Sequence, residues 1–238
     1  MSLTLVPRSA PPRAAPPVPA AGSLAALLGE ALERRGVPYC QWKGHGRRER
    51  WESGRGDIDL LVDRSAWAEF TAVLGGLGFK LALPPPGREA AGVVHYYGLD
   101  ERCGTLVHVH AYARLAIGLP WRTHYRLPLE DALVDSATPQ PGAVFKTPAP
   151  ELEVIVLVLR HTVRHTLRDL LRRRRPRWLC GAEADVDRAA ERVSRAALVA
   201  ALHRYLPEVT LGVFERCRDA LRPDCAPLRR WLARRALG

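Results

Sequence analysis

The chain has 238 residues, of which 47% are hydrophobic and 26% are charged. This allows one sizeable core, or a core domain with a smaller helical one. The net charge of +11 favours anionic partners, but nucleic acid is not favoured, because an arginine-rich, lysine-poor chain also reflects coding bias. The five cysteines form no CxxC pair, which argues against a disulfide framework and a structural zinc site. No segment reaches the roughly 18 apolar residues of a membrane span.

The first 22 residues are rich in proline and alanine and contain arginine but no acid. They lack the apolar run of about 7–15 residues that a signal peptide needs. We therefore predict a disordered tail over residues 1–22 and a cytoplasmic protein. A transit peptide is the less favoured alternative.

Residues 23–147 are predicted to form one α/β unit, because helix-like and strand-like patterns succeed one another along it. The first helix has Ser23 as a plausible N-cap and Gly36 as a plausible stop, and a hairpin is expected around Gly104. The predicted elements are a helix (23–36), a strand (37–44), a polar loop (45–56), a strand (57–63), a helix (64–78), an edge strand (79–83), two hairpin strands (93–100 and 105–115) and then loops.

Residues 148–238 are predicted to form a helical domain, with helices over 151–171, 184–206, 209–221 and 226–237. The expected fold class is therefore α+β with an α/β core. A mixed sheet flanked by helices is followed by the C-terminal helices. The oligomeric state does not follow from these patterns.

The run GDIDLLV (56–62) places two carboxylates in a strand that is otherwise apolar. Positions i and i+2 of a strand share a face, so Asp57 and Asp59 are expected to project together. Two carboxylates this close both stay ionised only beside a cation, and hard oxygen ligands suit Mg²⁺ or Mn²⁺. From spacing alone, the alternative is that Asp57 caps the loop and Asp59 pairs with an arginine.

A basic, glycine-rich segment precedes the two aspartates. A glycine turn beside a strand offers backbone N–H groups to phosphate, and neighbouring cations supply charge. The candidates for binding nucleotide phosphate are Lys43, Gly44, Arg47, Arg48 and Arg55. The plain alternative is a solvated loop.

The order helix, strand ending in Lys-Gly, loop, then G-D-x-D-L-L-V resembles the nucleotidyltransferase superfamily, whose fold is that of DNA polymerase beta. More narrowly, the run YCQWKG…GRGDIDLLVDR…LGF…HYYGLD…LVHVHAYARLAIG…YRLPLE…PELEVIVLVLR is similar to uncharacterised bacterial nucleotidyltransferase-family proteins. The resemblance covers residues 25–170.

This resemblance implies transfer of a nucleoside monophosphate from an NTP to an acceptor, with release of pyrophosphate. Asp57 and Asp59 would hold Mg²⁺ or Mn²⁺, which activates the attacking oxygen and clamps the α-phosphate. Gly44 would mark the phosphate-facing turn. The acceptor is unknown, and a small molecule or glycan precursor is favoured.

The sequence departs from the superfamily pattern in two places. The turn has Lys-Gly-His instead of Gly-Ser, and the later strand that should carry a third carboxylate has His108 and His110. These two histidines share a strand face. They either complete the metal site, with His108 as a further candidate ligand, or one acts as a general base, or the site binds nucleotide without turning it over.

Two alternative functions follow. One is a degenerate nucleotidyltransferase fold that binds nucleotide or scaffolds a partner, which the H-x-H substitution supports. The other is a toxin–antitoxin type nucleotidyltransferase that modifies protein or RNA. The long helical half argues against the second, because such proteins are usually shorter.

A second pair of histidines, His161 and His165, lies four residues apart on the predicted helix 151–171. No acid completes an H-E-x-x-H motif, which excludes a zinc-protease reading. We expect a polar helix face that lines the cleft between the two halves. The basic run at 172–177 is expected to be a solvated loop, with polyanion contact as the alternative.

Overall fold

The computed structural model describes residues 22–44, 48–85, 92–119, 123–172, 179 and 181–237. Except for Gly22, the predicted disordered tail lies outside the described residues. So do Arg47 and residues 173–177 of the basic run.

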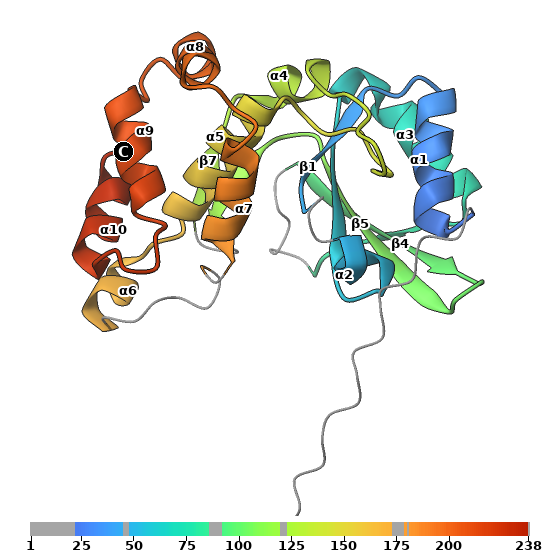
Figure 1. Ribbon diagram of the computed structural model, residues 1–238. Coiled ribbons are helices and arrows are strands. Elements are labelled where there is room, and N and C mark those ends of the chain that lie inside the picture. The colour runs from blue at the N-terminus through green and yellow to red at the C-terminus, as the bar shows by residue number, and fades with distance from the viewer. Residues whose placement is uncertain are drawn as a thin grey trace, which may run out of the picture.

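The N-terminal half contains a five-stranded mixed sheet in the order β1–β2–β5–β4–β3, on the right in Figure 1. Its strands are β1 (Tyr39–Lys43), β2 (Asp57–Val62), β3 (Lys80–Ala82), β4 (Val93–Asp100) and β5 (Thr105–Tyr112). The β2–β5 pair is parallel, and the other pairs are antiparallel. The predicted hairpin around Gly104 and the predicted edge strand are confirmed, and so is the α+β class.

One face of the sheet is apolar and is covered by α1 (Leu24–Arg34) and α3 (Trp67–Gly76), as Figure 1 shows. Ser23 is the N-cap of α1, as predicted: its side chain accepts a hydrogen bond from the Ala26 N–H. Alternate residues of the central strands, Ile58 and Val109 among them, are fully buried here. This face supplies hydrophobic stabilisation, and the alternation sends the intervening residues to the other face.

The opposite face is covered at one end only. There Leu61 and Tyr112 join an apolar cluster that also contains residues of α5 and the later helices. Two parts of this cluster lie in a segment for which we expected loops: the hairpin of β6 (Ala116–Leu119) and β7 (Thr123–Arg126), and α4 (Glu130–Asp135). Buried side chains explain why this segment forms regular structure where loops were expected: Ile117 and Leu133 are only 5% and 0% exposed.

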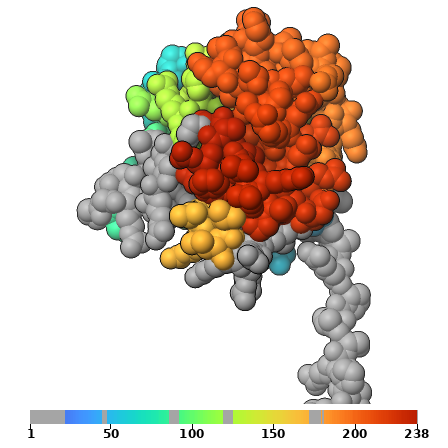
Figure 2. Space-filling model, turned by 90° about the vertical axis from the view of Figure 1, so that its left-hand side faces the viewer, coloured from blue at the N-terminus to red at the C-terminus, as the bar shows by residue number. Residues whose placement is uncertain are grey.

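The C-terminal half is helical, as predicted, but two expected long helices are each broken in two. The helices are α5 (Pro150–Thr162), α6 (Leu167–Arg172), α7 (Ala182–Ala190), α8 (Arg195–Tyr205), α9 (Leu211–Asp219) and α10 (Pro227–Arg235). Capping explains both breaks: Thr166 and Asp169 exchange hydrogen bonds at the start of α6, and Ser194 caps α8. Figure 2 looks onto the surface that α8–α10 form, with α6 at its lower edge. None of the helices in the described ranges has the length and apolar character needed to cross a bilayer.

The expected polar loop 45–56 contains a short helix, α2 (Arg48–Glu52). Trp51 is the reason: its ring is 3% exposed and packs 6.0 Å from the Phe145 ring, centroid to centroid. The side chains of Arg48 and Glu52 also form an ion pair one turn apart. The segment is therefore anchored where it approaches the end of β1.

Candidate functional site

The DxD and HxH motifs lie side by side on the half-open face of the sheet. In the parallel β2–β5 pair, Asp57 is opposite His108, and Asp59 is opposite His110. Because residues at i and i+2 share a face, all four side chains project in the same direction. The sequence predicted each pair, and the strand register brings the two pairs together.

Both histidines contact the carboxylates directly. His108 Nδ1 lies 2.8 Å from Asp57 Oδ1, and His110 Nδ1 lies 3.3 Å from Asp59 Oδ1 and 3.6 Å from Asp57 Oδ2. The hydrogen bond from His108 lowers the pKa of Asp57 and outweighs the opposing effect of burial. The side chains of His108 and His110 are 16% and 17% exposed, so a small ligand can reach them.

Asp59 is the more buried carboxylate, and it is held by a cation. Lys43 Nζ lies 2.6 Å from Asp59 Oδ1, and the Tyr112 hydroxyl donates to the same oxygen at 3.0 Å. Burial raises the pKa of Asp59, but the charge of Lys43 and hydrogen bonds from His110 and Lys43 outweigh it and lower that pKa to about 2. Burial lowers the pKa of Lys43, against the attraction of Asp59, and it raises the pKa of Tyr112. Asp59 is therefore ionised at neutral pH.

Gly44 forms a turn directly beside Asp59. Its φ of 79° lies in the left-handed region, which glycine adopts without strain. A Cβ built at this position would lie 3.7 Å from Asp59 Oδ2. The predicted phosphate-facing glycine therefore adjoins the acidic pair.

The arginines that were predicted to bind phosphate do not lie together. Arg48 forms an ion pair with Glu52 and donates to the Gly142 carbonyl, whereas Arg55 donates to Ser53 Oγ at 3.1 Å in an exposed position. Of these two, only Arg48 lines the cavity described next. Arg47 lies outside the described residues.

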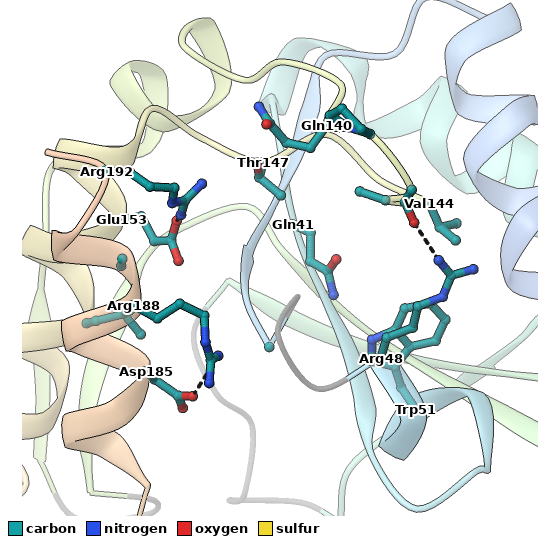
Figure 3. A pocket seen from close by; sticks show the side chains of 16 residues that line it. Gln41, Arg48, Trp51, Gln140, Val144, Thr147, Glu153, Asp185, Arg188 and Arg192 are labelled. Atoms are coloured by element: carbon teal, nitrogen blue, oxygen red, sulfur yellow. Dashed lines mark hydrogen bonds and ion pairs between the residues drawn. The ribbon is translucent and has the colours of Figure 1, made fainter. Parts of the chain in front are cut away.

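A cavity of about 410 Å³ opens beyond the β1 edge of the sheet, between the sheet and helices α5 and α7 (Figure 3). Gly44 lines it, so the cavity and the acidic pair share a boundary. In Figure 3, Arg188 of α7 and Arg192, two residues beyond its end, approach from the side opposite Arg48, and their partners are Asp185 and Glu153, respectively. The lining residues are Gln41, Gly44, Arg48, Trp51, Gln140–Val144, Thr147, Glu153, Leu157, Asp185, Arg188, Ala189 and Arg192.

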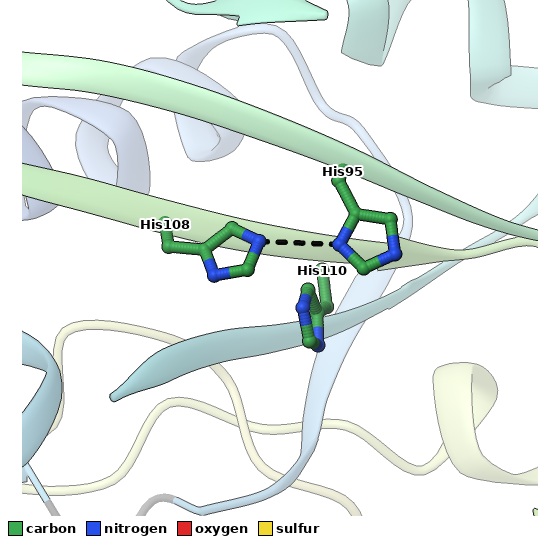
Figure 4. A group of neighbouring side chains, drawn as sticks. All are labelled: His95, His108 and His110. Atoms are coloured by element: carbon green, nitrogen blue, oxygen red, sulfur yellow. Dashed lines mark hydrogen bonds between the residues drawn. The ribbon is translucent and has the colours of Figure 1, made fainter. Parts of the chain in front are cut away.

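Sequence reasoning missed His95. It lies on β4 opposite His110, and its Nδ1 is 3.2 Å from His108 Nε2 (Figure 4). Burial, and then the charges of His110 and His108, lower the pKa of His95. The predicted hairpin could have revealed His95, because strand pairing on either side of Gly104 determines which residues of the two strands lie opposite one another.

The second histidine pair does not line the cavity. His161 and His165 are buried, at 4% and 1% exposure, and His165 follows the end of α5 at Thr162. The face of α5 that lines the cavity carries Glu153 and Leu157 instead. The expectation of a polar, cleft-lining histidine face was therefore wrong, because α5 packs that region against later helices.

Comparison of the chain with protein-family models, with curated proteins and with solved structures gives no significant match. The function of the chain is therefore inferred from the geometry of the site.

Proposed function

We propose that the protein is a divalent-metal-dependent nucleotidyltransferase, which moves a nucleoside monophosphate from an NTP to an acceptor. One observation carries the proposal: Asp57 and Asp59 converge with His108 and His110 on the open part of a sheet face. A glycine turn and a cavity adjoin the same point. Carboxylates, a phosphate-compatible turn and space for a ligand are the components that metal-assisted phosphoryl transfer needs.

The donor set fits a divalent cation. Oxygens of both carboxylates lie within 3.6 Å of one atom, His110 Nδ1, so they are directed at a common region. Asp59 stays ionised because its pKa is about 2, and metal ligands must be deprotonated. Mg²⁺ or Mn²⁺ held by Asp57 and Asp59 would polarise the α-phosphate of the NTP.

The protein's own groups have separate roles in this scheme. His108 and His110 orient the carboxylates through their Nδ1 contacts, in place of a third acid. Gly44 leaves room for a phosphate next to Asp59. Lys43 balances the charge of Asp59 before nucleotide binds and is free to turn to phosphate when a metal takes its place.

The proposed step forms a bond between an acceptor hydroxyl oxygen and the α-phosphorus and breaks the bond between that phosphorus and the oxygen that bridges to the β-phosphate. The hydroxyl proton passes to water, and pyrophosphate departs. A small molecule or glycan precursor is the favoured acceptor, and cytoplasmic location remains part of the proposal.

A test of transfer uses the full chain with Mg²⁺ or Mn²⁺ and each α-labelled NTP. We expect the wild type to release pyrophosphate, with water as the attacking group when no other acceptor is present, and to transfer label once an acceptor is added. Both should be lost in the Asp57→Asn/Asp59→Asn double variant. Ile58→Val is the matched control, since Ile58 lies between the two aspartates and faces the apolar core. Absence of pyrophosphate, label transfer and metal-dependent NTP binding in the wild type would overturn the proposal.

A second candidate is a nucleotide-binding protein without turnover. The Lys43–Asp59 ion pair favours it, because the ammonium group and Tyr112 satisfy Asp59 Oδ1 without a metal. Binding of NTP in equilibrium dialysis without release of pyrophosphate would support this candidate over the first.

A further inference from the structure

Three histidines converge beside the acidic pair. His108 and His110 are on β5, and His95 is on the antiparallel strand β4, directly opposite His110. One ring nitrogen of each lies within 4.8 Å of the other two, and all three side chains are half-buried (Figure 4). They belong to two strands of one hairpin, which is a rigid base for a site.

One pair of nitrogens already has the spacing of a metal site. A tetrahedral ion with nitrogen ligands at about 2.0–2.1 Å separates neighbouring nitrogens by about 3.3 Å. His95 Nδ1 and His108 Nε2 are 3.2 Å apart. Two nitrogens on one ion can be no more than about 4.2 Å apart, so His110 reaches the same ion after a small turn of its ring.

Asp57 determines which nitrogen of His108 is available. When His108 Nδ1 donates its proton to Asp57 Oδ1, at 2.8 Å, Nε2 has a free lone pair directed at His95. Metal-ligating histidines usually have such a carboxylate on their other nitrogen, which fixes the tautomer and the ring. The Tyr97 ring adds support, since it stacks on His108 with centroids 4.1 Å apart and planes at 11°.

The geometry points to a site in which His95, His108 and His110 bind one transition-metal dication of the Zn²⁺ class, with Asp57 orienting His108. Imidazole nitrogens suit Zn²⁺ and its neighbours, whereas Mg²⁺ prefers oxygen. Three protein ligands leave a fourth position for water or substrate, the pattern of reactive rather than structural zinc sites. The inference does not depend on nucleotidyl transfer, because its evidence is the arrangement of the nitrogens.

The test uses the tag-free full chain, treated with EDTA and then titrated with Co²⁺ in the absence of nucleotide. We expect the visible absorption of four- or five-coordinate Co²⁺, saturating at one ion per chain. Zn²⁺ should displace the Co²⁺, and millimolar Mg²⁺ should not. In His95→Gln the affinity should fall at least 100-fold, whereas His203→Gln, on the exposed side of α8, should bind as the wild type does.

A second measurement needs no variant of the site. Diethyl pyrocarbonate modification, mapped by mass spectrometry, should show that Zn²⁺ protects His95, His108 and His110 but not the exposed His203. Equal modification with and without Zn²⁺, or full affinity in a folded His95→Gln variant, would overturn the inference. Since neither assay contains NTP, Zn²⁺ binding without transfer would count only against the proposed function. Transfer without Zn²⁺ binding would count only against this site.

Discussion

The protein contains two closely spaced histidine pairs, and they differ in their access to solvent. His108 and His110 lie on β5 beside two carboxylates, at 16% and 17% side-chain exposure. His161 and His165 lie at the end of α5 and just beyond it, at 4% and 1% exposure, and the charged groups near His165 are Arg230, Asp169 and Arg234. Close spacing along the chain is therefore only the first condition for a site: the histidines must also be accessible to a ligand.

The largest expected effect is a difference in activity between variants of the two histidine pairs. In His108→Ala/His110→Ala, both aspartates lose the partners that orient them, and each loss should cost 10–100-fold. The proposed nucleotidyl transfer should therefore fall about a thousandfold. His161→Gln/His165→Gln should keep the wild-type rate per folded molecule. Pyrophosphate release measured on both variants checks this, and an equal loss in the two would contradict the comparison.

The next largest expected effect concerns His165 of the second pair, and it is a loss of folding stability at mildly acidic pH. Burial, and then the charge of Arg230, lower the pKa of His165 to about 4 from 6.5. The unfolded chain therefore takes up a proton at His165 below about pH 6.5, and the folded chain does so only below about pH 4. As pH falls through this window, His165 should cost up to about 3 kcal/mol of unfolding free energy.

Urea unfolding at pH 4.5 and 7.5 measures this loss. His165→Gln should reduce the difference between the two pH values. If the wild type and the variant lose the same stability, His165 is not the titrating group.

A smaller loss of folding stability is expected at lower pH, and it comes from Asp59 on the sheet. The pKa of Asp59 is lowered to about 2, so its stabilisation is complete above about pH 4 and is lost as the pH falls toward 2. The amount is about 2 kcal/mol. Asp59→Asn should remove this dependence between pH 5 and 2.5. An unchanged acid limb in the variant would show that the Lys43–Asp59 pair does not stabilise the fold.

The smallest effect concerns the residue between the two aspartates. Ile58 is fully buried on the apolar face, and Ile58→Val removes one methylene, at a cost of about 1 kcal/mol. Transfer per folded molecule should stay at the wild-type level. A tenfold loss of transfer would mean that the two faces of β2 are not independent.

Much of this site was predictable from local pattern. Alternation along a strand predicted that Asp57 and Asp59 share a face, and likewise His108 and His110. The hairpin prediction also contained His95: a turn over residues 101–104 pairs 100 with 105, and continued pairing places 95 opposite 110. Following that register from the sequence would have added the third histidine.

The rest depended on contacts between distant segments. The parallel β2–β5 pair joins strands that are separated by α3, β3 and β4, and no local pattern fixes its register. The short helix α2 depends on Trp51 packing on Phe145, which lies more than ninety positions further along the chain. The breaks after α5 and before α8 depend on capping side chains, which compete with an otherwise continuous helical pattern.

Trp42 connects the site to an optical signal. Its indole, 2% exposed, lies edge-on to the Tyr112 ring with centroids 5.1 Å apart, and Lys43 Nζ is 5.0 Å from its centroid. Tyr112 and Lys43 both contact Asp59 Oδ1. A cation or phosphate that displaces Lys43 from Asp59 therefore changes the electric field across the indole. The protein thus has an intrinsic fluorophore at the site, and in a chain with Trp42 as its sole tryptophan the emission would report occupancy without an added label.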